Sequence, residues 1–331
     1  MVFGNSGFFH CFAVPDTAYP VIDIIVRRDE QKILYALKGR SFTAGEAAAA
    51  AVETGGAFKQ DVAGTLYRRG LIIQTDGENE GGPHYRISDF YGRLDIFVRS
   101  ELDTYRTFSE DIRRNLDRWY FSAYYSRLDI RPDKGPNAEK TLPLKETLEF
   151  AENESRQAYL ALCDCRALAW GLYGRENCAK PMETCISYHS GPNTLSDMGI
   201  SRPVSVDYVK EVIRDADRAG LMHRVNASGI CNCCIDCCYQ SRAMKRRNRT
   251  IRLYEEPAGK ALWPYSAKRI SVNTDNCAAC GTCVKRCPFR LFTLNKSGIS
   301  ADTKHCAGCG LCVSTCPAKA LSLAPRPREE L

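Results

Sequence analysis

The chain has 331 residues, of which 44% are hydrophobic and 26% are charged, and its formal net charge is +7. The hydrophobic content is enough for packed cores in roughly two to three domains. A peptide that is held together only by bound metal is therefore excluded. No segment approaches ~18 uninterrupted apolar residues, and a membrane-spanning helix is therefore not expected. The modest positive charge fits an acidic protein or a nucleic acid as a partner and does not choose between them.

The 18 cysteines are concentrated in the second half of the chain, where they form short CxC, CC and CxxC units. Such units suit metal thiolates in a reducing compartment better than long-range disulfides. The first residues lack a basic segment followed by an apolar run, so we predict no export signal and a cytoplasmic protein. Only Cys11 precedes residue 163, and its apolar neighbours indicate a small core residue.

Residues 1–90 are expected to form the first domain, which has the pattern of a winged helix. Its expected elements are three amphipathic helices, a strand and a polar wing, at 29–40, 41–53, 58–69, 71–74 and 75–88. Ser41 or Thr43 is a candidate N-cap for the second helix. This pattern resembles bacterial winged-helix regulators.

The third of these helices would be the one that contacts DNA if the domain binds it. Its solvent face offers side chains suited to phosphates and base edges: Lys59, Gln60, Thr65, Arg68 and Arg69. Asp61 lies among them and opposes DNA binding. Winged helices also serve as structural or protein-docking modules, and we favour that interpretation.

Residues 91–143 are expected to form one long or broken helix followed by a linker. Apolar and aromatic residues recur every three to five positions from Phe90 to about Leu128, which is typical of a core or a dimer seam. A flavin beside this aromatic stripe is the alternative, but no GxGxxG follows a strand, and we find no flavin or nucleotide motif. Three prolines within 131–143 indicate the linker.

Residues 144–260 are expected to form a mainly helical, cysteine-rich domain. Its first four cysteines are Cys163, Cys165, Cys178 and Cys185. Four thiolates fit one 4Fe-4S cluster or one zinc ion equally well by count. A helix at about 204–220 then leads to five cysteines within eight residues, namely Cys231, Cys233, Cys234, Cys237 and Cys238. These could hold a further cluster or share ligands with the first group, and the spacing leaves the ligand subset open.

A basic segment follows directly. Its residues are Arg242, Lys245, Arg246, Arg247, Arg249 and Arg252. A solvated helix face, an acidic partner protein and a nucleic acid are the three interpretations, in that order of preference.

Residues 261–331 contain the spacing CxxCxxCxxxCP twice, from Cys277 to Pro288 and from Cys306 to Pro317. The doubled motif resembles bacterial two-cluster ferredoxins, in which the last cysteine of each copy binds the other cluster. The resemblance implies two sets of iron ligands, which are Cys277, Cys280, Cys283 and Cys316 for one 4Fe-4S cluster and Cys306, Cys309, Cys312 and Cys287 for the other. Zinc knuckles are a weaker alternative because they need only paired CxxC units.

The chain as a whole is similar to a group of ferredoxin-related proteins of anaerobic bacteria, on the strength of CxCR, CNCC with a following CC, and the doubled motif. The similarity extends from Asp29 to Ala318 and implies an α+β fold that ends in a two-cluster ferredoxin domain. It also implies low-potential electron transfer with a larger anaerobic oxidoreductase as the partner. In this company, one or two further 4Fe-4S clusters are expected in the central domain.

We find no phosphate-binding glycine loop, nucleophile elbow or HExxH motif. The sequence therefore predicts an electron-transfer component of an oxidoreductase system, with a homodimer as one form of assembly. Two alternatives stay open. One is a redox-sensing winged-helix regulator of transcription, and the other is a redox enzyme whose central cluster has an open iron site.

Overall fold

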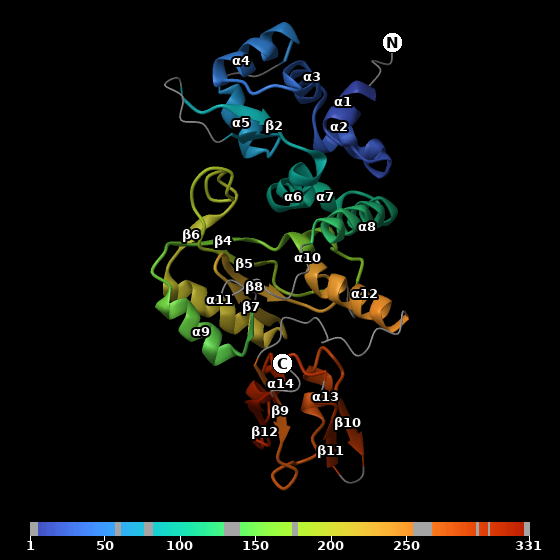
Figure 1. Ribbon diagram of the computed structural model, residues 1–331, viewed down its shortest axis with the longest axis vertical. Coiled ribbons are helices and arrows are strands. Elements are labelled where there is room, and N and C mark those ends of the chain that lie inside the picture. Colours follow the sequence, from blue (N-terminus) through green and yellow to red (C-terminus); the bar gives the residue numbers. More distant parts are fainter. Residues whose placement is uncertain are drawn as a thin grey trace. The chain divides into compact units, whose positions relative to one another are not determined.

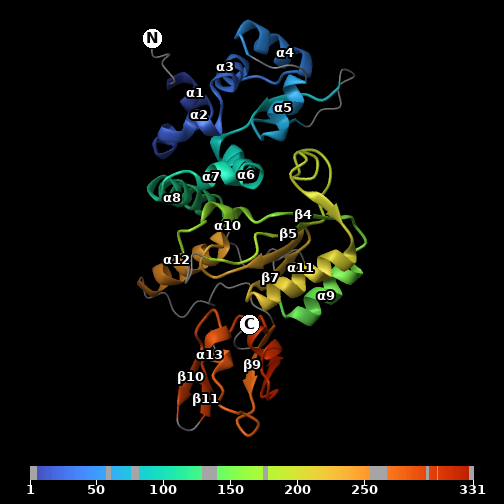
Figure 2. The same ribbon diagram turned by 180° about the vertical axis from the view of Figure 1, so that it is seen from behind.

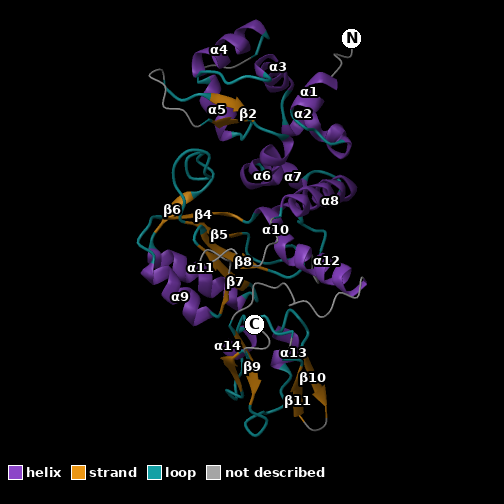
Figure 3. Cartoon of the chain, in the orientation of Figure 1, coloured by secondary structure: helices purple, strands orange, loops and turns teal. Residues whose placement is uncertain are grey.

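The computed structural model describes residues 6–56, 61–75, 82–128, 140–173, 178–253, 267–295, 298–303 and 305–327. Helices and small sheets are mixed along the chain (Figure 3). The chain divides into two compact units. Unit 1 comprises residues up to 127 together with 167–172 and 190–202, and unit 2 comprises 128–166, 173–189 and 203–331. Among the described residues, no helix is both long enough and apolar enough to cross a bilayer.

Unit 1 consists of helices and one antiparallel pair of strands (Figure 1). In chain order its elements are α1 (Ser6–Cys11), the 3-10 helix η1 (Asp16–Val21), α2 (Ile22–Ile25), α3 (Arg28–Leu37), α4 (Ala44–Glu53), α5 (Val62–Arg68), β1 (Ile72–Gln74), β2 (Tyr85–Ile87), α6 (Phe90–Ser100), α7 (Leu102–Arg106) and α8 (Glu110–Arg127). Phe42 extends the β1–β2 pair by a bridge to Tyr85. Helices and strands are thus present in the order predicted for 29–88, although 57–60 and 76–81 lie outside the described residues.

Local sequence signals set the starts of these helices. Thr43 caps α4, and its hydroxyl and the Glu46 carboxylate each accept from the other's backbone N–H in a capping box. The Asp61 and Asp89 carboxylates likewise accept from backbone N–H groups in the first turns of α5 and α6. The prediction of Thr43 as a cap is confirmed.

The helix predicted from Phe90 to Leu128 is broken into α6, α7 and α8. The first break lies at Glu101, whose backbone leaves the helical region at φ −128° and ψ 37°, and the second lies between Arg106 and Glu110. Phe90, Phe97 and Tyr105 from the aromatic stripe are buried within unit 1. The stripe therefore belongs to a core.

Unit 2 contains a six-stranded sheet in the order β3-β7-β8-β5-β4-β6. The elements of its first part are β3 (Lys140–Leu142), α9 (Leu144–Asn153), β4 (Ala158–Leu162), α10 (Asp164–Leu168), β5 (Glu183–Ser187), β6 (Arg202–Val204), α11 (Val206–Arg218), β7 (Met222–Asn226), β8 (Gly229–Cys233) and α12 (Tyr239–Leu253). The prediction of a mainly helical central domain missed this sheet. The strands are only three to five residues long, and cysteines interrupt their apolar alternation, so the period-2 signal is weak.

One face of this sheet carries the apolar core. Leu160, Ile186, Val225 and Ile230 are buried there, and α9 and α11 pack side by side over them, as Figures 1 and 2 show. Side chains alternate along a strand, so the neighbours of these residues point to the opposite face. The cysteines of β5 and β8 therefore lie on the face away from α9 and α11.

The last part of unit 2 is made of two antiparallel strand pairs and two short helices. Its elements are β9 (Lys268–Val272), α13 (Thr282–Arg286), β10 (Phe292–Asn295), β11 (Gly298–Ala301), α14 (Leu311–Ser314) and β12 (Leu321–Pro325). β9 pairs with β12 and β10 pairs with β11, both antiparallel. Their apolar side chains pack against the cysteines of this segment.

Candidate metal centres

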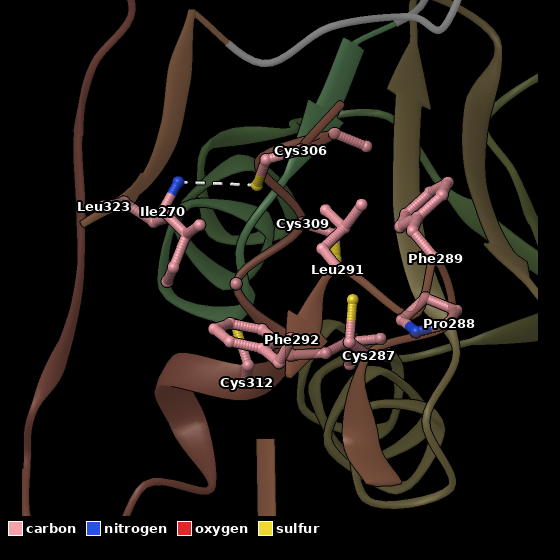
Figure 4. A pocket seen from close by; sticks show the side chains of 13 residues that line it. Ile270, Cys287, Pro288, Phe289, Leu291, Phe292, Cys306, Cys309, Cys312 and Leu323 are labelled. Carbon is pink, nitrogen blue, oxygen red and sulfur yellow. Dashed lines mark hydrogen bonds between the residues drawn. The ribbon is translucent and has the colours of Figure 1, made fainter. Parts of the chain in front are cut away.

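The segment 267–327 contains a cavity whose wall includes four cysteines (Figure 4). They are Cys287, Cys306, Cys309 and Cys312. Three come from the second copy of the motif, and Cys287 comes from the first. In Figure 4 the sulfur atoms of Cys287 and Cys309 point toward each other across the cavity.

A second cavity in the same segment is lined by the remaining four cysteines of the two motifs. They are Cys277, Cys280, Cys283 and Cys316. Here Cys316 is the residue contributed by the other copy. Cys283 is buried, whereas Cys280 is exposed. Each cavity therefore combines three cysteines of one motif with the last cysteine of the other.

Backbone geometry turns the cysteine loops around these cavities. Gly281 and Gly310 have φ of 71° and 73° and immediately precede α13 and α14. This left-handed conformation is open to glycine at little cost. The backbone N–H groups of Ile270 and Gly308 each donate to the Cys306 sulfur over 3.4 Å, and Figure 4 draws the bond from Ile270. Such donors stabilise negative charge on a thiolate.

Burial changes the acidity of these thiols. It raises the pKa of Cys309 to about 12 and also raises the pKa of Cys287 and Cys312. Exposed Cys280 is different, because a hydrogen bond with the Thr282 hydroxyl lowers its pKa. A buried set of thiolates needs compensating positive charge, which bound iron provides. The donor set therefore fits an iron–sulfur cluster.

The spread of the sulfur atoms bears on the kind of metal group. Among the described residues, two groups of three or more metal-ligating side chains have all their ligand atoms within 4.8 Å of one another, and both lie between Cys163 and Cys237. The cysteines of the two cavities form no such compact group. Their sulfurs are too far apart to surround one small ion. A cluster with several irons needs this wider spacing, because each thiolate binds a different iron.

In the central part of unit 2, five cysteines are linked by hydrogen bonds between their thiols. Cys163 and Cys165 flank the start of α10, directly after β4. Cys165 also contacts Cys238, which in turn contacts Cys233 at the end of β8, and Cys233 contacts Cys231 of the same strand. These contacts lower the pKa of Cys163 and Cys238 and raise that of Cys165 and Cys233. We call Cys163, Cys165, Cys238 and Cys233 the four-thiol group.

Three further cysteines form a separate compact group, Cys178, Cys234 and Cys237. We call it the thiol triad. Hydrogen bonds with Cys178 and Cys237 lower the pKa of Cys234 to about 2. The bond with Cys234 raises the pKa of Cys178, and the bonds with Cys178 and Cys234 raise the pKa of Cys237. The three sulfurs of the triad thus form one closely contacting set.

This grouping differs from the one expected from the sequence. Cys178 lies with Cys234 and Cys237, while Cys163 and Cys165 lie with Cys238 and Cys233. Cys185 of β5 is instead opposite Cys231 of β8 in the sheet register. Strand order decides these neighbours, because β8 pairs with β5 and brings the CNCC segment to the loops that flank β4 and β5.

Sequence reasoning missed one buried charged residue, Arg166. Its guanidinium donates to the Thr184 hydroxyl over 3.0 Å and to the Asn232 carbonyl over 2.7 Å. Burial lowers its pKa, but the thiolates of Cys163, Cys234 and Cys178 outweigh burial and raise it. Arg166 therefore compensates negative charge from both central groups. The CDCR sequence, with arginine directly after the second cysteine, was the available signal.

The side chains expected to contact DNA are not all accessible. Arg69 is nearly buried and pairs with Glu30 at 2.6 Å and with Glu101 at 2.9 Å. Exposed Arg68 pairs with Asp61 at 3.1 Å. Lys59 and Gln60 lie outside the described residues. The prediction that Arg69 belongs to a free DNA-contacting face was wrong.

The basic segment after the CNCC motif makes local contacts. The Arg242 guanidinium lies over the Tyr173 and Tyr239 rings, at 4.7 and 5.0 Å from their centres. The Lys245 ammonium donates to the Ile235 carbonyl over 3.0 Å. The side chains of Arg247, Arg249 and Arg252 are outside the described part of the structure.

Comparison with known proteins identifies one part of the chain. A family model for the 4Fe-4S dicluster domain matches residues 269–317, which contain all eight cysteines of the two cavities. A search of curated proteins found no match. The matched segment supports iron–sulfur cluster binding, and the rest of the chain is interpreted from its own geometry.

Proposed function

Proceeding from the dicluster domain at residues 269–317, we propose that this protein carries single low-potential electrons to or from a partner oxidoreductase. The observation that carries the proposal is the pair of cavities, each lined by four cysteines, inside that domain. When bound, 4Fe-4S clusters supply reversible one-electron oxidation and reduction. The cysteine usage of the chain supports a reducing compartment such as the cytoplasm.

The proposed iron ligands follow the two cavities. Cys287, Cys306, Cys309 and Cys312 hold one cluster, and Cys277, Cys280, Cys283 and Cys316 hold the other. The chain's own residues then control the environment. Ile270, Leu291 and Phe292 exclude water from the first cavity, and the N–H donors on Cys306 stabilise its thiolate. Both effects tune the potential at which an electron is accepted.

The second cavity is the proposed place of contact with the partner. Cys280 is exposed there, and the side chain of Leu294, which is 45% exposed, lies close to Gly281. An exposed thiolate ligand beside an apolar side chain gives a partner both a short electron path and a contact surface.

We assign the helices and strands of 29–88 to a winged-helix docking module.

The four-thiol group is the proposed site of a third 4Fe-4S cluster. Cys163, Cys165, Cys238 and Cys233 provide four ligands. Cys163 and Cys165 form a compact group with Asp164, but Cys238 and Cys233 do not join it, so the four sulfurs together are more widely spread than those of the thiol triad. Arg166 and Arg224 supply positive charge, since the Arg224 guanidinium lies 3.8 Å from the Cys238 sulfur.

The test is anaerobic purification followed by quantification of iron and acid-labile sulfide and by reduction with dithionite. We expect visible absorbance that bleaches on reduction and electron paramagnetic resonance signals of reduced 4Fe-4S clusters. Cys316→Ser should perturb the same signal as Cys283→Ser, and Cys287→Ser should perturb the other, because the last cysteines are exchanged. Cys11→Ser is the control. A colourless protein without sulfide would defeat the proposal, and pairing of Cys287 with Cys283 would defeat the ligand assignment.

A further inference from the structure

The thiol triad is a closed triangle of sulfur atoms. All three sulfurs lie within 4.8 Å of one another, and those of Cys178 and Cys234 are 3.9 Å apart. Cys234 and Cys237 are buried and Cys178 is half-buried. The fold thus brings one thiol that precedes β5 against two from the turn before α12.

The size of the triangle discriminates between metal groups. In a tetrahedral site with zinc–sulfur bonds of about 2.3 Å, two thiolates on the same ion are about 3.8 Å apart. In a 4Fe-4S cube each thiolate binds a different iron, so the sulfurs are held farther apart. The 3.9 Å separation agrees with a single ion. The cysteines of the dicluster domain, which form no such compact group, provide the internal contrast.

Local structure also suits a mononuclear site. Cys234 and Cys237 form a C-x2-C pair on one turn, a spacing common in zinc sites, and the Cys237 N–H donates to the Cys234 sulfur over 3.2 Å. Cys178 has φ of 50°, a left-handed conformation that is unfavourable for a non-glycine residue. Its thiol is therefore held toward the pair against a backbone preference.

We propose that Cys178, Cys234 and Cys237 bind one zinc ion through three thiolates, with the fourth coordination position open to water or a small thiol. Among the described residues, no other cysteine, histidine or carboxylate joins the triangle. Three protein ligands and an open position are typical of catalytic zinc, whereas structural zinc has four protein ligands. The net negative charge of such a centre is offset by buried Arg166. Because zinc has no redox chemistry, this centre is independent of the electron-transfer proposal.

Metal analysis of variants tests the site. We expect about one zinc per chain in the anaerobic full-length protein, lost in Cys178→Ser and in Cys234→Ser, with iron and sulfide unchanged. Cys11→Ser, a cysteine-to-serine change in unit 1, should retain zinc. Zinc content unaffected by the triad variants, or a loss of four irons in place of zinc, overturns the proposal. Absence of iron and sulfide from every protein would defeat electron transfer and leave the zinc result intact.

Measurements on the unmodified chain remove any dependence on how the variants fold. Zinc-edge X-ray absorption in thiol-free buffer should show three sulfurs at about 2.3 Å and one lighter atom. In cobalt-substituted protein, added 2-mercaptoethanol should strengthen the sulfur-to-cobalt charge-transfer band as the fourth position is filled. Four sulfurs in thiol-free buffer, or a cobalt spectrum unchanged by the thiol, would contradict the open position.

Discussion

Two glycines at the turns that follow the cluster loops show how one residue shapes a cavity. Gly281 and Gly310 share the left-handed conformation. Their surroundings differ, because a Cβ on Gly310 would lie 2.8 Å from the Pro143 ring, whereas the nearest atom to a Cβ on Gly281 is a Leu294 methyl at an ordinary 3.5 Å. Substitutions at these two glycines therefore distinguish the cost of the left-handed backbone from the cost of steric crowding.

Gly310→Ala should therefore destabilise the protein more than Gly281→Ala. We expect a loss of about 1 kcal/mol for Gly281→Ala from the conformation alone and of about 3 kcal/mol for Gly310→Ala, because overpacking against Pro143 adds to it. Anaerobic guanidinium unfolding followed by circular dichroism measures both. Equal losses would show that the contact with Pro143 relaxes without cost.

At the scale of elements, the break between α6 and α7 is fixed by a buried ion-pair network. The Glu101 carboxylate accepts from the guanidiniums of Arg93, at 2.6 Å, and of Arg69, at 2.9 Å, and Arg93 is fully buried. Burial would raise the pKa of Glu101, but these two charges outweigh it and hold the pKa below its ordinary value. The network joins α6 to the end of α5.

This network predicts an acid-sensitive unit 1. The pKa of Glu101 is lower in the folded state than in the unfolded state. Its contribution to the free energy of unfolding is therefore complete above the unfolded-state pKa of about 4.3, and it is lost as pH falls through the folded-state pKa. Glu101→Gln should lower the free energy of unfolding by about 2 kcal/mol near neutral pH. It should also reduce the dependence of that free energy on pH in the acid range. Urea unfolding monitored by tryptophan fluorescence at several pH values checks this. Asp103→Asn, at an exposed pair, is the control, and an equal loss there would refute the argument.

The elements also show what the sequence could reveal. Thr43 and the doubled cysteine spacing are local signals, and the helices of 29–53 and the two cavities could be predicted from them. The central sheet was missed because β3 arises from the expected linker and because no strand exceeds five residues. The partners of Cys178 could not be predicted, since contacts between distant segments depend on strand order. In the sequence, the only signal for Arg166 was its position directly after Cys165 in the CDCR segment.

At the scale of the molecule, the dicluster domain and the central sheet belong to one compact unit. Arg286, which directly precedes the proposed ligand Cys287, donates to the Arg218 carbonyl over 2.9 Å and lies 3.4 Å from the Asp217 carboxylate. Ser314 donates to the same carboxylate over 3.2 Å. Asp217 is buried and also lies 3.7 Å from His223 of β7. Arg286 thus connects a cluster loop to the end of α11 and the sheet.

Removing Arg286 should uncouple these two parts. Arg286→Ala leaves the buried Asp217 carboxylate without its guanidinium partner, and breaking such a pair costs about 3 kcal/mol. We expect cluster absorbance and the circular dichroism of the sheet to be lost together in the unmodified protein, and absorbance to be lost first in the variant. Lys285→Ala removes the same charge one residue earlier from an exposed position, so it separates the contact from the charge. Two coincident transitions in Arg286→Ala, or a separation as large in Lys285→Ala, would show that this contact does not couple the cluster loop to the sheet.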